Sequence, residues 1–220
     1  MVAVDEDDLR LQTESITDVQ VLPISWAATG ITETLALAIF SPDGHWFAAS
    51  SYSGILGIWD VAADKPLSHS KSPLGYPLAF SPDGRLLVTT SEDGLLRLID
   101  PRTGRVVKEL IGHPGPVWSA AFSQNGKGLV TSGSEDDPRV WDVSTGKQQI
   151  ALVGHSGTVV SAVFSPDSER VATASLDDTA RIWPVTIDDL VRIARSRVQR
   201  LQPELTPEER KTYRLDQTSP

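Results

Sequence analysis

Two groups of histidine, serine and aspartate in this chain have the residue types of a hydrolytic site. His155, Ser175 and Asp177 form one group, and the other is made of His113, Ser132 and Asp136. In a catalytic triad an aspartate orients a histidine, and the histidine takes the proton of a serine nucleophile. The elements that position these side chains decide whether they catalyse a reaction or hold the fold together.

Other catalytic signatures are absent from the sequence. The 220 residues include no cysteine, so neither a thiolate nucleophile nor a cysteine zinc ligand exists. The four histidines, at positions 45, 69, 113 and 155, have no metal-binding spacing. A phosphate-binding glycine loop and a Gly-x-Ser-x-Gly elbow are also missing. We expect no metal and no cofactor.

A phenylalanine followed by serine recurs at an almost constant interval. Its positions are Phe40, Phe80, Phe122 and Phe164, so the intervals are 40, 42 and 42 residues. Nineteen residues after each phenylalanine stands one of Trp59, Ile99, Trp141 and Trp183. This constant phase identifies four copies of one structural unit.

Each unit is typical of four short antiparallel strands. An apolar run ends at the phenylalanine, as in VVSAVF at 159–164, and a Pro-Asp-Gly or Asn-Gly turn follows in most copies. A second strand, a third ending at the tryptophan position, and a more polar fourth complete the unit. Four strands in about 42 residues make a β-propeller blade. We therefore predict an all-β fold of four blades, in a partial or small propeller.

These units resemble WD40 repeats. Gly112-His113 and Gly154-His155 match the Gly-His pair of that family, and Trp59-Asp60 and Trp141-Asp142 match its Trp-Asp pair. The resemblance covers about residues 31–185, with repeats at 31–70, 71–112, 113–154 and 155–185. In the family, the loop histidine, a strand Ser or Thr, a turn aspartate and the tryptophan form a buried hydrogen-bonded set.

The resemblance implies that the two histidine groups are structural. The third repeat offers His113, Thr131 or Ser132, Glu135 or Asp136, and Trp141; the fourth offers His155, Thr173 or Ser175, Asp177 and Trp183. Among the alternatives we favour Ser132, Asp136 and Ser175. The second repeat keeps Asp93 and the first keeps Trp59, but each lacks other members. A set that recurs in two repeats favours a structural role, because an active site would occur once.

The two ends of the chain differ from the repeats. Residues 1–30 include VQVLPISW at 19–26, a candidate outer strand of an earlier blade. Residues 186–220 predict an α-helical tail, since Thr186 is a suitable N-cap and apolar residues follow at helical spacing. This tail is similar to that of bacterial multi-blade WD40 proteins, although Arg210 stands where those proteins have tryptophan. The similarity implies the C-terminal part of a larger propeller; a shortened relative and a protomer that completes its ring by self-association are the alternatives.

Composition limits the partners. The net charge of −9 opposes binding to nucleic acid, and no apolar run reaches the length of a membrane helix. The acidic N-terminus is unlike a signal peptide, so we expect a cytoplasmic protein. The inner strands carry no carboxylate, histidine or lysine to line a catalytic channel, which counts against an enzyme.

We predict a non-catalytic interaction scaffold or sensor that binds a protein or peptide through propeller loops. The loops near 112–118, 134–139, 154–159 and 176–181 would form the binding face. Trp118, Arg139 and Arg181 are the residues we expect to contact the partner, because aromatic residues and arginine dominate interface energetics. A non-autonomous C-terminal fragment of a larger signalling protein is the first alternative, and a propeller enzyme the second.

Overall fold

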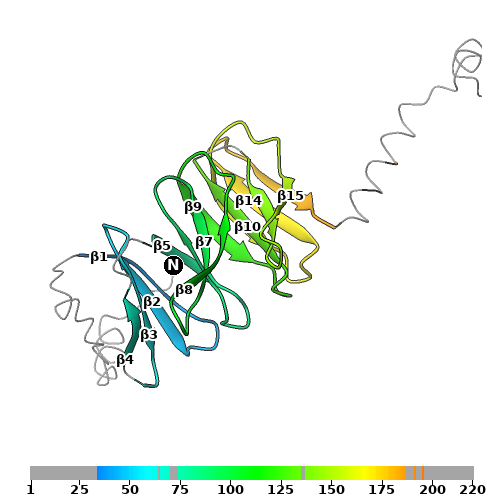
Figure 1. The fold of residues 1–220 in the computed structure, drawn as a ribbon. Coiled ribbons are helices and arrows are strands. Elements are labelled where there is room, and N and C mark those ends of the chain that lie inside the picture. Colours follow the sequence, from blue (N-terminus) through cyan, green and yellow to red (C-terminus); the bar gives the residue numbers. More distant parts are fainter. Residues whose placement is uncertain are drawn as a thin grey trace, which may run out of the picture. The chain divides into compact units, whose positions relative to one another are not determined.

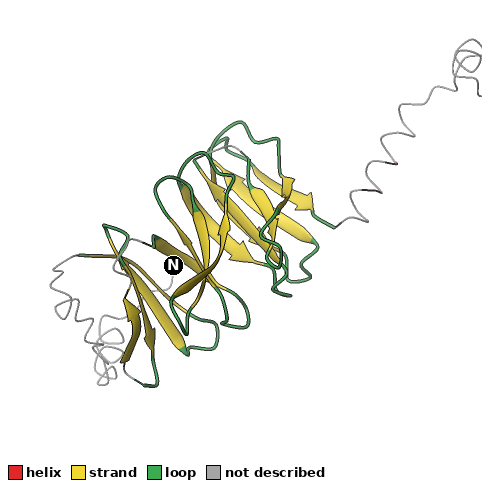
Figure 2. Ribbon diagram, in the orientation of Figure 1, coloured by secondary structure: helices red, strands yellow, loops and turns green. Residues whose placement is uncertain are grey.

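The computed structural model describes residues 34–63, 65–69, 74–134, 137–186, and the two positions 191 and 195. Figure 2 shows strands joined by loops and turns throughout the repeats. The strands form four antiparallel sheets, which we call blades 1 to 4 in chain order (Figure 1). The prediction of an all-β fold built from propeller blades is confirmed.

In each blade the strands lie side by side in chain order. Blade 1 contains β1 (Leu35–Phe40), β2 (Trp46–Ser51), β3 (Leu56–Asp60) and β4 (Lys65–His69). Blade 2 contains β5 (Tyr76–Phe80), β6 (Leu87–Thr90), β7 (Leu96–Asp100) and β8 (Arg105–Leu110). Blade 3 contains β9 (Val117–Phe122), β10 (Gly128–Gly133), β11 (Arg139–Asp142) and β12 (Gln148–Ala151). Blade 4 contains β13 (Val159–Phe164), β14 (Arg170–Ser175) and β15 (Ala180–Pro184).

The repeated Phe-Ser motif forms the turn between the first and second strands. In blade 2 the Ser81 hydroxyl donates to the Asp83 carboxylate at 2.6 Å and accepts the backbone N–H of Leu86 at 2.9 Å. The same pair of bonds joins Ser123 to Asn125 and to the N–H of Gly128 in blade 3. The serine and the acid or amide of the motif are therefore turn residues, with their hydrogen-bonding capacity used locally.

The last position of this turn has a left-handed backbone. Gly44, Gly84 and Gly126 occupy it in blades 1 to 3 with φ between +67° and +70°. In blade 4 the position is Ser168, with φ of +63°. Only glycine adopts this conformation without a steric cost, so blade 4 contains local strain that its siblings avoid.

The hydrophobic core consists of three layers, one at each joint between consecutive blades. At the joint of blades 2 and 3, for example, Val88 and Leu98 pack against Leu129 and Trp141. The front face of a blade packs on the following blade, and its back face packs on the preceding one. Front faces carry Ala48 and Ile58, Val88 and Leu98, and Val130 and Val140; back faces carry Leu87 and Ile99, Leu129 and Trp141, and Val171 and Trp183.

Two predictions fall largely outside the described residues. The segment 1–30, with its candidate strand at 19–26, lies there entirely. The predicted helical tail at 186–220 is described only at Thr186 and at Val191 and Arg195, the last two of which are helical. Blade 4 has three strands within the described part of the chain, in line with the absence of a fourth strand pattern before residue 186.

Candidate functional site

The histidine of the fourth repeat lies at the centre of a buried hydrogen-bond network. His155 Nδ1 lies 2.7 Å from Asp177 Oδ2, and its Nε2 lies 2.7 Å from the Thr173 hydroxyl. The indole N–H of Trp183 donates to the same hydroxyl at 2.9 Å. The network thus links the loop of His155, the strands β14 and β15 and the turn of Asp177, and each of these polar groups has a hydrogen-bond partner.

The Asp177–His155–Thr173 chain has the connectivity of a hydrolytic triad, but its environment is that of a core. The His155 side chain is completely buried and that of Asp177 nearly so. Thr173 is also buried, and its oxygen accepts the indole N–H in addition to facing the histidine. A nucleophile must reach a substrate carbon, and this hydroxyl has no such access. The arrangement stabilises the blade.

Several donors converge on the Asp177 carboxylate. The Thr179 hydroxyl donates to it at 2.6 Å, and the backbone N–H groups of Ser156 and Thr179 donate at 3.1 and 3.0 Å. The bond from Thr179, followed by that from His155 and the backbone donors, holds the pKa of Asp177 well below its ordinary value. The carboxylate is therefore a fixed anchor for the loop that carries His155.

Blade 3 repeats the central part of this network. His113 Nε2 lies 2.8 Å from the Thr131 hydroxyl, and the Trp141 indole donates to that hydroxyl at 2.8 Å. The predicted acid, Asp136, and its alternative Glu135 lie outside the described residues. The same threonine–histidine–tryptophan arrangement thus occurs in two neighbouring blades.

The hydroxyl in both networks belongs to threonine, whereas the prediction from the sequence is serine. Ser175 lies two residues nearer the end of β14 than Thr173, and its hydroxyl donates to the Gly157 carbonyl at 2.7 Å. Ser132 directly follows Thr131 in β10, so its side chain projects from the opposite face of the strand. Its buried hydroxyl has no hydrogen-bond partner among the described residues. Ser132 and Ser175 are therefore replaced by Thr131 and Thr173 in the network.

Blades 2 and 1 use different contacts at these positions. The Thr89 hydroxyl donates to the Leu74 carbonyl at 2.7 Å, in the place where the other two threonines face a histidine. Asp93 is exposed and accepts the Leu95 N–H at 3.1 Å and the Ser91 hydroxyl at 2.9 Å, which lowers its pKa. Trp59 is buried, with its ring 5.6 Å from that of Phe47.

One end of the blades carries the loops in which we predicted a binding face. Because each blade is antiparallel, the loop between its second and third strands lies beside the start of its first strand. Backbone bonds join the two places, as from Leu176 N–H to the Thr158 carbonyl at 2.9 Å and from Ser134 N–H to the Pro116 carbonyl at 2.9 Å. We call this end the loop face; it comprises 52–55, 74–76, 91–95, 111–118, 134, 152–159 and 176–179.

Trp118 is an exposed aromatic residue on the loop face. Val117 pairs with Gly133 and Ser119 with Ser132, so Trp118 is the extra residue of a β-bulge. Its side chain is 52% exposed, whereas the tryptophan of the same blade, Trp141, is buried. The bulge releases Trp118 from the ladder and presents its ring to solvent.

Arg139 and Arg181, predicted alongside Trp118, make contacts within their own blades. Arg139 Nη1 donates to the Gln148 side chain at 2.8 Å, and the guanidinium of Arg181 lies 5.9 Å from the centre of the Trp183 ring. Both side chains are only partly exposed. Arg139 is thereby bound to the fourth strand of blade 3, and Arg181 lies over the tryptophan ring of its own strand, β15.

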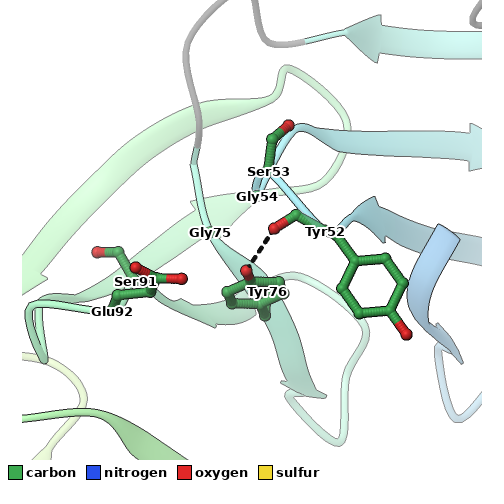
Figure 3. Close-up of a pocket in the computed structure, with 7 residues that line it drawn as sticks. All are labelled: Tyr52, Ser53, Gly54, Gly75, Tyr76, Ser91 and Glu92. Atoms are coloured by element: carbon green, nitrogen blue, oxygen red, sulfur yellow. Dashed lines mark hydrogen bonds between the residues drawn. The ribbon is translucent and has the colours of Figure 1, made fainter. Parts of the chain in front are cut away.

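A cleft of about 340 Å³ lies on the loop face at the junction of blades 1 and 2. The Tyr76 hydroxyl donates to the Tyr52 carbonyl at 2.7 Å, and this bond bridges the two blades beside the cleft (Figure 3). Ser53, Ser91 and Glu92 complete its polar lining, with the backbone of two glycines. This cleft was not predicted from the sequence. Its residue Tyr76 could have been noticed as a second aromatic residue at the position of Trp118, because each stands four residues before the phenylalanine of its repeat, Phe80 or Phe122.

Within the described residues no group of three or more His, Cys, Asp or Glu side chains is arranged to hold a metal ion. The described part of the chain also contains no helix that is long and apolar enough to cross a membrane.

Known proteins share parts of this sequence. Meiotic recombination protein rec14 of Schizosaccharomyces pombe is 38% identical over 81 residues, which are 36% of this chain and 27% of rec14. Human Coronin-7 is 34% identical over 110 residues, or 49% of this chain and 12% of Coronin-7. COMPASS component SWD1 of Saccharomyces cerevisiae is 34% identical over 87 residues, or 36% of this chain and 20% of SWD1. The matches thus span about a quarter or less of these relatives.

The family model described as WD domain, G-beta repeat matches residues 28–60, 78–100, 104–142 and 146–184. Together these ranges cover more than half of the chain. The third range begins at β8 of blade 2 and ends in β11 of blade 3, so one sequence repeat joins two blades. With four blades in the structure and four matched repeats in the sequence, the chain belongs to the WD40-repeat family.

Proposed function

We propose that this chain is a non-catalytic interaction module that binds a protein or peptide partner through its loop face. The observation that supports this proposal most directly is the position of the exposed apolar side chains. Of the thirteen large apolar side chains that are exposed among the described residues, five lie on the loop face: Tyr52, Ile111, Trp118, Val153 and Leu176. Exposed apolar groups gathered at one end of a rigid scaffold are characteristic of an interaction site.

The loop face also offers a concave element. The cleft between blades 1 and 2 combines the phenol of Tyr76 with the Glu92 carboxylate and two serine hydroxyls. Such a cleft suits one side chain of a partner, while the apolar residues around it supply contact area. Trp118 is the residue expected to contribute most, because truncation of an interfacial tryptophan removes a large contact area.

The relatives support a role in protein assemblies. SWD1 is by name a component of COMPASS, and it is 34% identical to this chain over 87 residues. The burial of Thr173 and His155 supports the non-catalytic part of the proposal, since the arrangement with triad connectivity that the described residues contain is closed to substrate.

A displayed random-peptide library selected on the immobilised full chain tests the proposal. Peptides that bind the wild-type chain should bind Trp118→Ala or Tyr52→Ala at least about tenfold more weakly. Val107→Ala is the matched control, since Val107 is an exposed apolar residue on the outer strand β8, away from the loop face. Selected peptides whose affinity is unchanged in both loop-face variants would contradict the proposal.

A second experiment addresses catalysis. The wild-type chain is incubated with chromogenic ester, amide and phosphate substrates, beside Thr173→Val. We expect no turnover above background. Hydrolysis by the wild-type chain that disappears in Thr173→Val would show that the buried network is an active site.

A further inference from the structure

Two hydroxyl groups that line the cleft between blades 1 and 2 have already donated their hydrogens within the chain. The Tyr76 hydroxyl donates to the Tyr52 carbonyl at 2.7 Å (Figure 3). The Ser91 hydroxyl donates to the Asp93 carboxylate at 2.9 Å. Because a hydroxyl has one hydrogen, the oxygen atoms of Tyr76 and Ser91 can only accept further hydrogen bonds.

The other polar groups of the cleft add acceptors rather than free donors. The N–H of Gly54 is bonded to the Ser51 carbonyl, and that of Gly75 to the Gly54 carbonyl, both at 3.0 Å. The Ser53 hydroxyl has the Ser51 hydroxyl as a partner at 3.0 Å. Glu92 contributes a carboxylate, which only accepts hydrogen bonds when it is ionised. A ligand group that fits this cleft therefore supplies the donors.

The charge beside the cleft is negative. Glu92 and Asp93 are adjacent in the turn between β6 and β7, and both side chains are exposed. The Arg97 guanidinium donates to the Ser91 hydroxyl at 3.0 Å, but its charge is paired with the Glu109 carboxylate, at an N–O distance of 3.5 Å. The cleft thus favours a cation.

The rest of the loop face has the same sign of charge. Its acidic residues are Glu92, Asp93, Asp177 and Asp178, and the ranges that define it contain no lysine or arginine. Asp177 is held in the buried network, and the other three carboxylates are exposed. A partner of complementary charge therefore carries basic residues.

The turn that carries Glu92 also contacts blade 3. A Cβ on Gly94 would lie 2.4 Å from the Gly115 carbonyl oxygen, so this turn is in direct contact with the loop before β9. Trp118 follows that loop and is half exposed. The turn thus has the cleft of Tyr76 on the side of blade 1 and the loop that leads to Trp118 on the side of blade 3.

We propose that the partner of the loop face is a basic peptide segment, one of whose lysine or arginine side chains enters the cleft and binds Glu92. This inference rests on the proposed function, because it names the chemistry of the partner of that same face. An ammonium or guanidinium group only donates hydrogen bonds, which matches the acceptors of the cleft. Its charge is attracted to the Glu92 carboxylate and to the face of the Tyr76 ring.

Displayed libraries of short random peptides, each with a fixed central lysine, arginine, glutamate or leucine, test the proposal on the immobilised full chain. Binders should come from the lysine and arginine libraries, and few should come from the other two. Glu92→Gln should weaken the recovered peptides about tenfold, because it removes the charge and keeps the size of the side chain. Added salt should weaken their binding to the wild-type chain.

The matched control is Glu169→Gln, which removes the same charge elsewhere. Glu169 is exposed in the turn between β13 and β14, at the end of blade 4 opposite the loop face, so the recovered peptides should bind this variant as they bind the wild-type chain. Glu92→Lys should reverse the preference and recover peptides from the glutamate library. Circular dichroism and melting curves establish that each variant is folded.

The outcomes separate this inference from the proposed function. Peptides that lose affinity for Trp118→Ala but bind Glu92→Gln as well as the wild-type chain would overturn the basic-peptide proposal and leave the binding role of the loop face in place. An equal loss in Glu92→Gln and Glu169→Gln would also overturn it, because the attraction would then come from the net charge of the whole chain. The absence of binders from all four libraries would contradict both proposals.

Discussion

Thr131 and Thr173 stand 42 residues apart and make the same pair of contacts in neighbouring blades. Each hydroxyl lies 2.7 to 2.8 Å from the Nε2 of a histidine and accepts an indole N–H at 2.8 to 2.9 Å. One oxygen in the second strand thus links the loop before the first strand to the third strand. The polar network stabilises the blade from within, and the loop face outside it is left available for a partner.

Thr173→Val tests this linkage. Valine has nearly the same shape as threonine, but it leaves the Trp183 N–H and the His155 ring nitrogen without their partner. We expect the free energy of unfolding to fall by about 1–3 kcal/mol, measured by urea denaturation. The comparison is Ser175→Ala, which removes the bond to the Gly157 carbonyl and the bond accepted from the Asp177 N–H, but leaves both ring nitrogens of His155 with their partners. A larger loss in Ser175→Ala than in Thr173→Val would contradict the role given to the threonine.

The low pKa of Asp177 predicts acid sensitivity. Because its pKa in the folded chain lies below the ordinary value of 3.8, the unfolded chain binds more protons as the pH falls through that value. The carboxylate therefore contributes fully to stability above about pH 5 and progressively less below about pH 4. Melting temperatures from pH 6 to pH 3 should fall more steeply for the wild-type chain than for Asp177→Asn. Parallel curves for the two proteins would show that Asp177 is not a source of this dependence.

Asp177→Ala should lower the melting temperature near neutral pH, since it removes the acceptor shared by His155, Thr179 and the Ser156 N–H. The comparison is Ser53→Ala at the corresponding turn of blade 1, where the residue is exposed and has a serine hydroxyl, Ser51, at 3.0 Å. We expect a much smaller change there. Equal melting temperatures for Asp177→Ala and the wild-type chain would place Asp177 among ordinary surface turn residues.

Ser168→Gly should stabilise the chain. Ser168 has a φ of +63° at the position that glycine occupies in the other three blades. Glycine relieves the left-handed strain, but it also has greater backbone freedom in the unfolded chain. The net effect should raise the free energy of unfolding by about 0.5–1 kcal/mol. Gly126→Ala at the same position of blade 3 should have the opposite sign. Thermal or urea unfolding measures both, and a destabilised Ser168→Gly would show that the serine side chain matters more than its backbone strain.

Trp118→Ala should leave the fold nearly unchanged. Its ring is half exposed on a bulge, so the melting temperature should stay within about 4 °C of the wild-type value. Trp141→Ala, which removes a buried indole from the joint of blades 2 and 3, should cost about 3–5 kcal/mol. Unfolding of the Trp118→Ala variant would show that Trp118 belongs to the core, and the proposed binding face would then have to lie elsewhere.

Much of the blade could be predicted from local pattern. The phase between each phenylalanine and the tryptophan position indicated the strands, because a strand and its hairpin turn depend on neighbouring residues. Trp118 also stood out in the sequence, as an aromatic residue at the first strand of its blade. The predicted contacts of Arg139 and Arg181 with a partner remain predictions, and both side chains are engaged within their blades.

The sequence by itself therefore determined the four blades, because their pattern recurs with the period of the fold, and it also indicated the histidine and tryptophan that brace blades 3 and 4 and the aspartate that braces blade 4. Only the tertiary structure decided that Thr173 faces His155 while Ser175 bonds to Gly157, because both side chains project from the same face of β14 and differ in their height along it. Only the tertiary structure decided, likewise, that Ile182 is exposed and Val140 is buried, although the two residues occupy the same position of the repeat. Their burial differs because the environment of a front face depends on what packs against it, and no residue within the blade specifies that.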